Sequence, residues 1–165
     1  MDKIPEFDER GNLPVGYHKC ELSDLEERFS KRLSLKRKKI MNAYKIHLQE
    51  IINTGLAVDH WVDGSFITNM KYPNDIDLFT IFDGVKTDEL SMKNKVDSII
   101  CTAQERFNSM CDSHRAYKYP KHMETEYNSY KSAKTKYLGL LFNSDRKYNL
   151  KGVINLEIEK IKGGE

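Results

Sequence analysis

The chain has 165 residues, a formal net charge of +2, 39% hydrophobic residues and 32% charged residues. This length suits one domain with its own core and is too short for two ordinary domains, and the balanced composition argues against a disordered chain. A charge so close to neutral excludes a basic coat over the whole surface, although a local basic patch stays compatible with it. We therefore expect a single domain over residues 1–165 that begins with an N-terminal arm, residues 1–22.

The cysteines and the hydropathy predict a cellular setting. Cys20, Cys101 and Cys111 show no metal-ligand spacing, and their odd number does not suit a disulfide framework. The first eleven residues lack the apolar stretch of a secretion signal, and no apolar run approaches the roughly 20 residues that span a bilayer. We expect a reduced, cytoplasmic protein that does not insert directly into a membrane.

The pattern of turn and apolar residues predicts the elements in chain order. Turn-forming residues dominate the arm, and Ser23 with Glu26 has the spacing of a capping box at a helix start. The helix that follows is one long helix, or two with a break near Ser34, and ends near Gly55. The remaining expected elements are a strand over 58–63, a helical turn over 66–69, a strand over 76–82, a helix over 88–110, a strand over 114–119, a helix over 124–142 and a strand over 153–159. This alternation predicts an α/β (α+β) domain in which long helices cover a small mixed sheet.

One stretch, from Trp61 to Phe82, combines features that suit phosphate chemistry. Gly64 lets backbone approach a ligand without a Cβ atom in the way, and Ser65 begins a helical turn whose N–H groups favour an anion. Asp75 and Asp77 occupy positions i and i+2 of a strand, so both carboxylates project from one face. An isolated Asp-x-Asp is most simply two solvated side chains at a strand end, but the preceding Gly-Ser at this distance favours a functional site.

Two carboxylates so close together repel each other. At roughly 4 Å and an effective dielectric near 20 the penalty is about 4 kcal/mol, so a proton, a basic partner or divalent cations must offset it. Mg²⁺ or Mn²⁺ suits this role, since such ions bind carboxylate oxygens and substrate phosphates together.

Gly64-Ser65 followed by Asp75-Ile76-Asp77 resembles the signature of the polymerase-beta-like nucleotidyltransferase superfamily. The chain is most similar to a family of small bacterial proteins within it, through the arm 7–18, the helix start 25–29 and the stretches 142–146 and 151–154. The resemblance implies a minimal nucleotidyltransferase fold in which Asp75 and Asp77 are metal ligands and Ser65, with Gly64, contacts the triphosphate.

Active members of the superfamily add a third carboxylate from a neighbouring strand. Two candidates stand out here: Glu157, on the polar face of the last expected strand, and Asp112, just before the expected third strand. We favour Glu157 as the catalytic third carboxylate, while a solvated strand face explains it about equally well.

Several basic residues are candidates for phosphate contacts. Lys71 lies beside the motif, and Arg146 and Lys151 lie in a loop that can return to it, so we assign them to nucleotide binding. A nucleic-acid acceptor would also suit the six basic side chains between residues 31 and 39, although a solvated helix face explains them more simply: Lys31, Arg32, Lys36, Arg37, Lys38 and Lys39.

The expected activity is transfer of a nucleoside monophosphate, from an NTP such as ATP or from a dNTP, to a hydroxyl acceptor. The shortness of the chain suggests a homo-oligomer or a partner protein that completes the acceptor site. Likeness to stand-alone bacterial nucleotidyltransferases of anti-phage defence, paired with a membrane effector, suggests template-independent oligonucleotide synthesis. The alternatives are nucleotidylation of tRNA or protein, as in toxin–antitoxin systems, and a non-catalytic module that binds a nucleotide or a partner.

Overall fold

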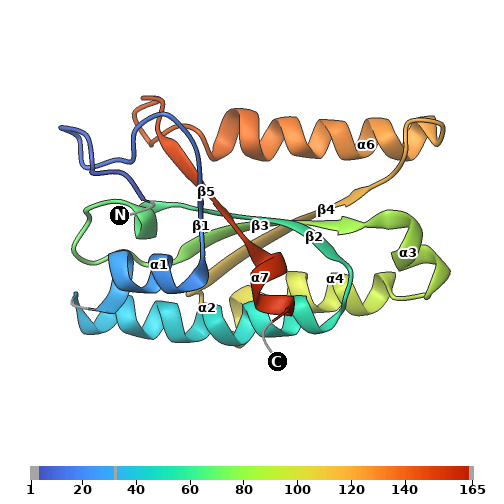
Figure 1. Ribbon diagram of the computed structural model, residues 1–165, viewed down its shortest axis with the longest axis horizontal. Helices are drawn as coiled ribbons and strands as arrows, with labels where there is room; N and C mark the ends of the chain where they lie inside the picture. Colours follow the sequence, from blue (N-terminus) through green and yellow to red (C-terminus); the bar gives the residue numbers. More distant parts are fainter. Residues whose placement is uncertain (1–3, 32, 164–165) are drawn as a thin grey trace.

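The computed structural model describes residues 4–31 and 33–163 (Figure 1). Within these residues the strands form one five-stranded sheet in the order β1-β5-β2-β3-β4. The strands are β1 (Gly16–Cys20), β2 (Ala57–Asp63), β3 (Ile76–Asp83), β4 (Cys111–Lys118) and β5 (Gly152–Leu156). β2 pairs antiparallel with β3 and β5, whereas β1 with β5 and β3 with β4 are parallel. This mixed sheet and its helices confirm the expected α+β class.

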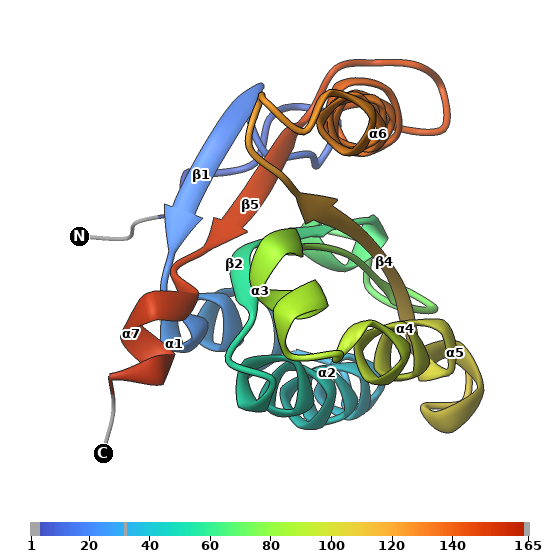
Figure 2. The same cartoon turned by 90° about the vertical axis from the view of Figure 1, so that its right-hand side faces the viewer.

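Helices lie against both faces of the sheet. α2 and α4 pack on one face, and α6 runs along the other (Figures 1 and 2). The helical segments are α1 (Leu22–Glu26), η1 (Glu27–Lys31), α2 (Leu35–Asn53), η2 (Ser65–Ile67), α3 (Gly84–Glu89), α4 (Lys93–Cys101), α5 (Ala103–Arg106), α6 (Glu124–Lys134), η3 (Thr135–Leu141) and α7 (Ile158–Lys162). None of these, over the described residues, has both the length and the apolar character of a membrane-spanning helix.

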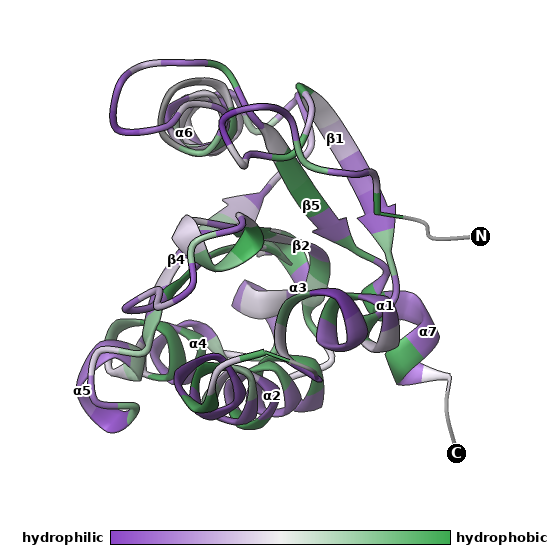
Figure 3. Cartoon of the chain, turned by 90° about the vertical axis from the view of Figure 1, so that its left-hand side faces the viewer, coloured by the Kyte–Doolittle hydropathy of each residue, from purple (hydrophilic) through white to green (hydrophobic). Residues whose placement is uncertain are grey.

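The central strand β3 is apolar on both sides because helices cover both. Leu78 and Phe82 belong to the larger core cluster, which includes the buried residues of α2, while Phe79 and Ile81 belong to a smaller cluster with Leu138. The alternation of side chains along a strand divides the residues of β3 between the two clusters. Figure 3 shows the mixed hydropathy of α2, whose buried side places Ile40, Tyr44, Leu48 and Ile51 in the larger cluster.

The N-terminal part departs from the prediction in two ways. The expected arm contains a strand, β1, which pairs with β5, and residues 1–3 of the arm lie outside the described residues. The capping box at the first helix uses Glu21 and Asp24 rather than the predicted pair two residues later. The break near Ser34 is confirmed: Ser34 caps α2, and its Oγ accepts a hydrogen bond from the Arg37 N–H at 3.3 Å.

The expected helix over 88–110 is wrong, because the structure has three shorter helices instead. The Asp83 side chain caps α3 by accepting from the Lys86 N–H at 3.0 Å, and the backbone turns at Ser91, whose φ of 52° ends a right-handed helix. Asn108 and Ser109 also have positive φ and form the tight turn into β4. β4 therefore begins at Cys111 rather than at residue 114, and Asp112 lies inside the strand.

Candidate active site

Three aspartates form a row across three neighbouring strands. Asp63 is opposite Asp77 in the β2–β3 register, and Asp77 is opposite Asp112 in the β3–β4 register. Residues directly opposite each other on adjacent strands project from the same face with Cβ atoms about 4.5–5.5 Å apart. Asp75, two residues before Asp77, adds a fourth carboxylate directly before β3. The row lies on the sheet face that α6 covers, just beyond Phe79.

Gly64 makes this concentration of carboxylates sterically feasible. Its φ is +86°, a conformation that side-chain-bearing residues rarely adopt, and a Cβ atom there would lie 2.0 Å from Asp77 Oδ2. The missing Cβ of Gly64 therefore leaves room for the Asp77 carboxylate, whereas the sequence predicted that it would leave room for a ligand. Ser65 follows as the first residue of η2, and its carbonyl accepts hydrogen bonds from the N–H and hydroxyl of Thr68.

Lys151 supplies the cation nearest the row. Its Nζ donates to Asp63 Oδ1, and both side chains are almost completely buried. Burial raises the pKa of Asp63 to about 6, against the opposing effect of the Lys151 charge. Lys151, predicted to bind the nucleotide, is thus paired with Asp63, which was not among the predicted site residues.

Arg146 and Lys36 act on the outer end of the site. Burial and the charge of Asp112 raise the pKa of Asp75, while Arg146 and Lys36 lower it. Arg146 is exposed, in a loop stabilised by Asp145, which accepts hydrogen bonds from the backbone N–H groups of Lys147 at 2.8 Å and Asn149 at 3.0 Å. The loop between η3 and β5 thus brings two of the three predicted phosphate-binding cations to the carboxylates.

Asp112 is held by a chain of polar contacts from the helical layer. Its Oδ1 lies 3.2 Å from His114 Nε2, and His114 Nδ1 lies 3.2 Å from the Tyr137 hydroxyl. The two rings stack with centroids 4.8 Å apart. The hydrogen bond to His114 is the main reason that the pKa of Asp112 is lowered.

Asp77, at the centre of the row, has the most perturbed environment of the three. Burial raises its pKa to about 7, and the charges of Asp75, Asp63 and Asp112 add to this, whereas Lys151 opposes it. The site therefore combines an excess of negative charge with oxygen ligands, the donor type that Mg²⁺ and Mn²⁺ prefer. In the described part of the chain no three His, Cys, Asp or Glu side chains already close around a common point as a metal-binding group.

Glu157 does not join this site. Asn155 is opposite Trp61, so Glu157 is level with residue 59, four residues and about 13 Å along β2 from Asp63. The strand ends at Leu156, and Glu157 precedes α7, where its carboxylate accepts from Lys160 Nζ at 3.4 Å. The geometry therefore corrects the preference for Glu157: of the two candidates, the structure places Asp112 beside Asp77.

The predicted basic residues outside this loop have other surroundings. Lys71 lies on the segment between Ser65 and Asp75, with its Nζ 5.2 Å from the centre of the Tyr72 ring. Arg37 is buried and donates to backbone carbonyls of Phe29, Phe66, Thr68 and Met70, so it holds the segment after Ser65 instead of a phosphate. Of the other basic residues between 31 and 39, Arg32 is outside the described residues and the four lysines are exposed.

The comparisons with known proteins assign the chain to a family. Residues 5–157 match the model of a family of unknown function, DUF6932. No curated protein and no solved structure matches the chain. Since the match covers nearly the whole chain, this protein belongs to the DUF6932 family.

Proposed function

We propose that this DUF6932 protein is a metal-dependent nucleotidyltransferase that moves a nucleoside monophosphate from an NTP or dNTP to a hydroxyl acceptor. The observation that carries the proposal is the position of Asp112, directly opposite Asp77 on the neighbouring strand. With Asp75, it gives three carboxylates at the start of two parallel strands, next to Gly64 and Ser65. The sequence resemblance calls for a third carboxylate from a neighbouring strand, and Asp112 meets that requirement.

The donor set fits Mg²⁺ or Mn²⁺, which Asp75, Asp77 and Asp112 would hold. Their oxygens suit a hard cation. Burial, and after it the charges of the neighbouring aspartates, raises the pKa of Asp77, and a bound cation would offset both effects. When bound, such an ion polarises the triphosphate and neutralises charge that develops during transfer.

The residues of the chain would then position the two reactants. In the reaction the acceptor oxygen bonds to the α-phosphorus, the bond from that phosphorus to the bridging oxygen breaks, and pyrophosphate leaves. The acceptor hydroxyl would give its proton to a carboxylate of the row as the new bond forms. Arg146 is exposed and its charge acts on Asp75, which supports a role for its two-pronged guanidinium in binding the triphosphate.

The test is transfer with matched carboxylate variants. Pure protein is incubated with Mg²⁺ or Mn²⁺ and each labelled NTP and dNTP, alone and with oligonucleotide, tRNA or protein extract, and products are separated on denaturing gels. We expect Asp77→Asn and Asp112→Asn to lower transfer at least about 100-fold. Glu157→Gln, the control, should retain it. Loss of transfer in Glu157→Gln but not in Asp112→Asn would contradict the assignment.

The product identifies the biological role. A free ladder of oligonucleotides supports template-independent synthesis, the activity proposed for anti-phage defence, in which a membrane effector would be the partner. A labelled tRNA or protein indicates the toxin–antitoxin type of reaction. If no acceptor is labelled under any condition, the protein is a non-catalytic binding module and the proposal fails.

A further inference from the structure

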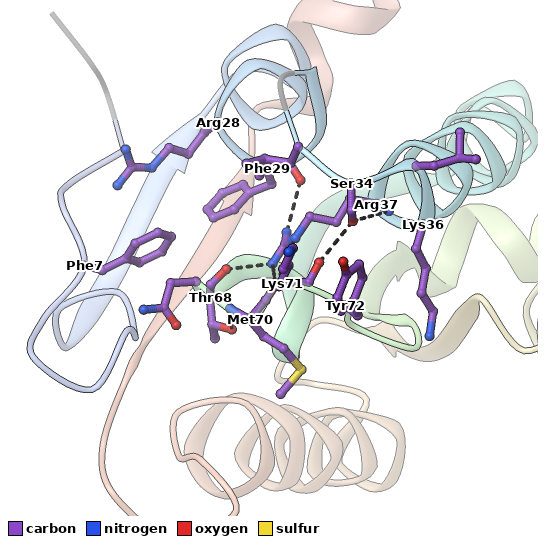
Figure 4. Close-up of a pocket in the computed structure, with 13 residues that line it drawn as sticks. Phe7, Arg28, Phe29, Ser34, Lys36, Arg37, Thr68, Met70, Lys71 and Tyr72 are labelled. Carbon is purple, nitrogen blue, oxygen red and sulfur yellow. Dashed lines mark hydrogen bonds between the residues drawn. The ribbon is translucent and has the colours of Figure 1, made fainter.

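A pocket of about 910 Å³ lies where the segment between Ser65 and Asp75 meets the start of α2 (Figure 4). Residues 68–72 form one wall, and residues 33–37 form another. The volume is in the range of small-molecule binding sites. The first wall belongs to the segment that connects Ser65 to Asp75 in the sequence.

Apolar side chains remain exposed around this pocket. Leu33 is 48% exposed, Leu35 69%, Met70 50% and Tyr72 58%. All four line the pocket, and two of them come from each wall. Large apolar side chains that stay open to solvent together at a pocket are typical of a binding surface, and Tyr72 adds a flat aromatic face.

The charged side chains that line the pocket, among the described residues, are all cationic: Arg28, Lys36, Arg37 and Lys71. Arg37 is used by backbone carbonyls, whereas Lys36 and Lys71 are exposed at the rim. Lys38 and Lys39 continue the positive charge along α2, three and four residues after Leu35 and therefore on neighbouring parts of the helix surface. The surface thus pairs an aromatic and apolar pocket with a positively charged approach.

Lys36 connects the pocket with the carboxylates. Its Nζ donates to Asn74 Oδ1 at 2.7 Å, and Asn74 directly precedes Asp75. A side chain of the pocket wall therefore lies within hydrogen-bond distance of the residue next to Asp75.

We propose that this pocket binds the terminal base of a single-stranded oligonucleotide, whose terminal hydroxyl is the acceptor at Asp75. The inference rests on the proposed nucleotidyl transfer and names its acceptor. Any of the bases can stack on an aromatic ring. The lysines along the approach attract successive phosphates of a strand, and a mononucleotide would leave these lysines without a phosphate partner. A duplex end would not fit, since its bases are paired and stacked.

The test measures binding separately from transfer. Fluorescence anisotropy follows a labelled ten-nucleotide single strand in EDTA, with the matching duplex as competitor. We expect Tyr72→Ala to weaken binding at least about fivefold and Tyr72→Phe to restore it, since stacking needs only the ring. Lys71→Ala should weaken binding. It should also reduce the slope of log affinity against log salt concentration by about 1, the value for one lost phosphate contact. Tyr17→Ala, with an equally exposed tyrosine, and Lys95→Ala, with an exposed lysine on α4, are the controls.

The outcomes separate this proposal from the proposed activity. Asp77→Asn should bind the single strand like wild type but transfer nothing. Single-strand binding that depends on Tyr72, without any transfer, supports the pocket and contradicts the activity. Transfer to a protein or small acceptor, with no single-strand binding or with equal binding of duplex, overturns the pocket assignment and leaves the activity standing. Equal losses in Tyr17→Ala and Tyr72→Ala would also overturn it.

Discussion

At the scale of single residues, the site depends on a backbone conformation at Gly64. The strand β2 ends at Asp63, and the chain must turn away at once so that the Asp77 carboxylate has room. Only a residue without Cβ can do this at a φ of +86° while Asp77 Oδ2 occupies the space where Cβ would be.

Gly64→Ala should therefore destabilise the protein by more than the cost of a positive φ alone, because the new Cβ would also clash with Asp77. Gly55→Ala is the matched control, because Gly55 has a φ of +68° but open space where its Cβ would be. We expect a loss of about 1 kcal/mol for Gly55→Ala and about 2–4 kcal/mol for Gly64→Ala, measured by urea denaturation. Transfer should be lost in Gly64→Ala and retained in Gly55→Ala. Equal losses of stability would show that Asp77 does not limit this position.

A second residue, Arg37, explains how the segment after Ser65 keeps its shape without regular structure. Its guanidinium bonds to carbonyls at Phe66, Thr68 and Met70, and burial lowers its pKa to about 10. Of these bonds, the one to Phe66 is buried, as is a further one to Phe29, and without the guanidinium these two carbonyls would lack a donor.

Arg37→Met should cost about 3–5 kcal/mol, since two buried and two partly buried carbonyls lose their donor at once. Lys38→Met, at an exposed neighbouring position, should change the free energy of unfolding by less than about 0.5 kcal/mol. Urea denaturation measures both. A small effect of Arg37→Met would mean that water replaces the guanidinium in the folded protein.

At the scale of elements, the site is made where β3 and β4 pair in parallel and η3 packs over them. Tyr137 of η3 contacts His114, and His114 contacts Asp112, so the helical layer orients a strand carboxylate. The ring of Tyr137 also stacks on Phe79, 4.7 Å away between centroids, which fixes η3 against the sheet.

Tyr137→Phe should keep this packing and remove only the hydroxyl. We expect transfer to fall about tenfold and the Mn²⁺ or Mg²⁺ concentration for half-maximal rate to rise, since partners beyond the ligands tune metal sites by such factors. Tyr127→Phe, on α6, is the control and should leave both values unchanged. A Tyr137→Phe protein with normal metal dependence would show that the chain of contacts has no role in orienting Asp112.

The elements also show how far the sequence could predict the site. Gly64, Ser65, Asp75 and Asp77 are close in sequence, so local spacing was enough to group them. Asp112 depends on the register between β3 and β4, which the turn at Asn108 and Ser109 sets through positive φ angles that no apolar pattern marks. The strand β1 was missed for a similar reason. Most of its residues are not buried, so no apolar pattern marks it, and it is a strand because it pairs with β5, which is distant in the sequence.

At the scale of the whole molecule, the carboxylate row makes the stability of the fold depend on pH. Asp77 and Asp63 have pKa values of about 7 and about 6 in the folded protein, above the usual value near 3.8. At a pH between 3.8 and these raised pKa values, the two aspartates keep their protons in the folded chain but have released them in the unfolded chain. The free energy of unfolding must therefore fall as the pH rises from about 4 to about 7.

In EDTA we expect the two aspartates together to lower the free energy of unfolding by about 4 kcal/mol between pH 5 and pH 8, measured by urea denaturation at each pH. Asp77→Asn should flatten the profile and be more stable than wild type at pH 8. Asp88→Asn, away from the row, should preserve the wild-type slope. If Asp77→Asn keeps the slope, the row is not the source of the pH dependence.

The pairing of β1 with β5 joins the earliest strand to the latest, and it has a consequence for synthesis on the ribosome. Lys151, which neutralises Asp63, directly precedes β5, and Gly152 donates its N–H to the carbonyl of Leu13 at 2.8 Å. A nascent chain that has already made all four aspartates still lacks the cation and the strand that hold them. The site would therefore mature only when translation has passed residue 156, so incomplete chains should be inactive.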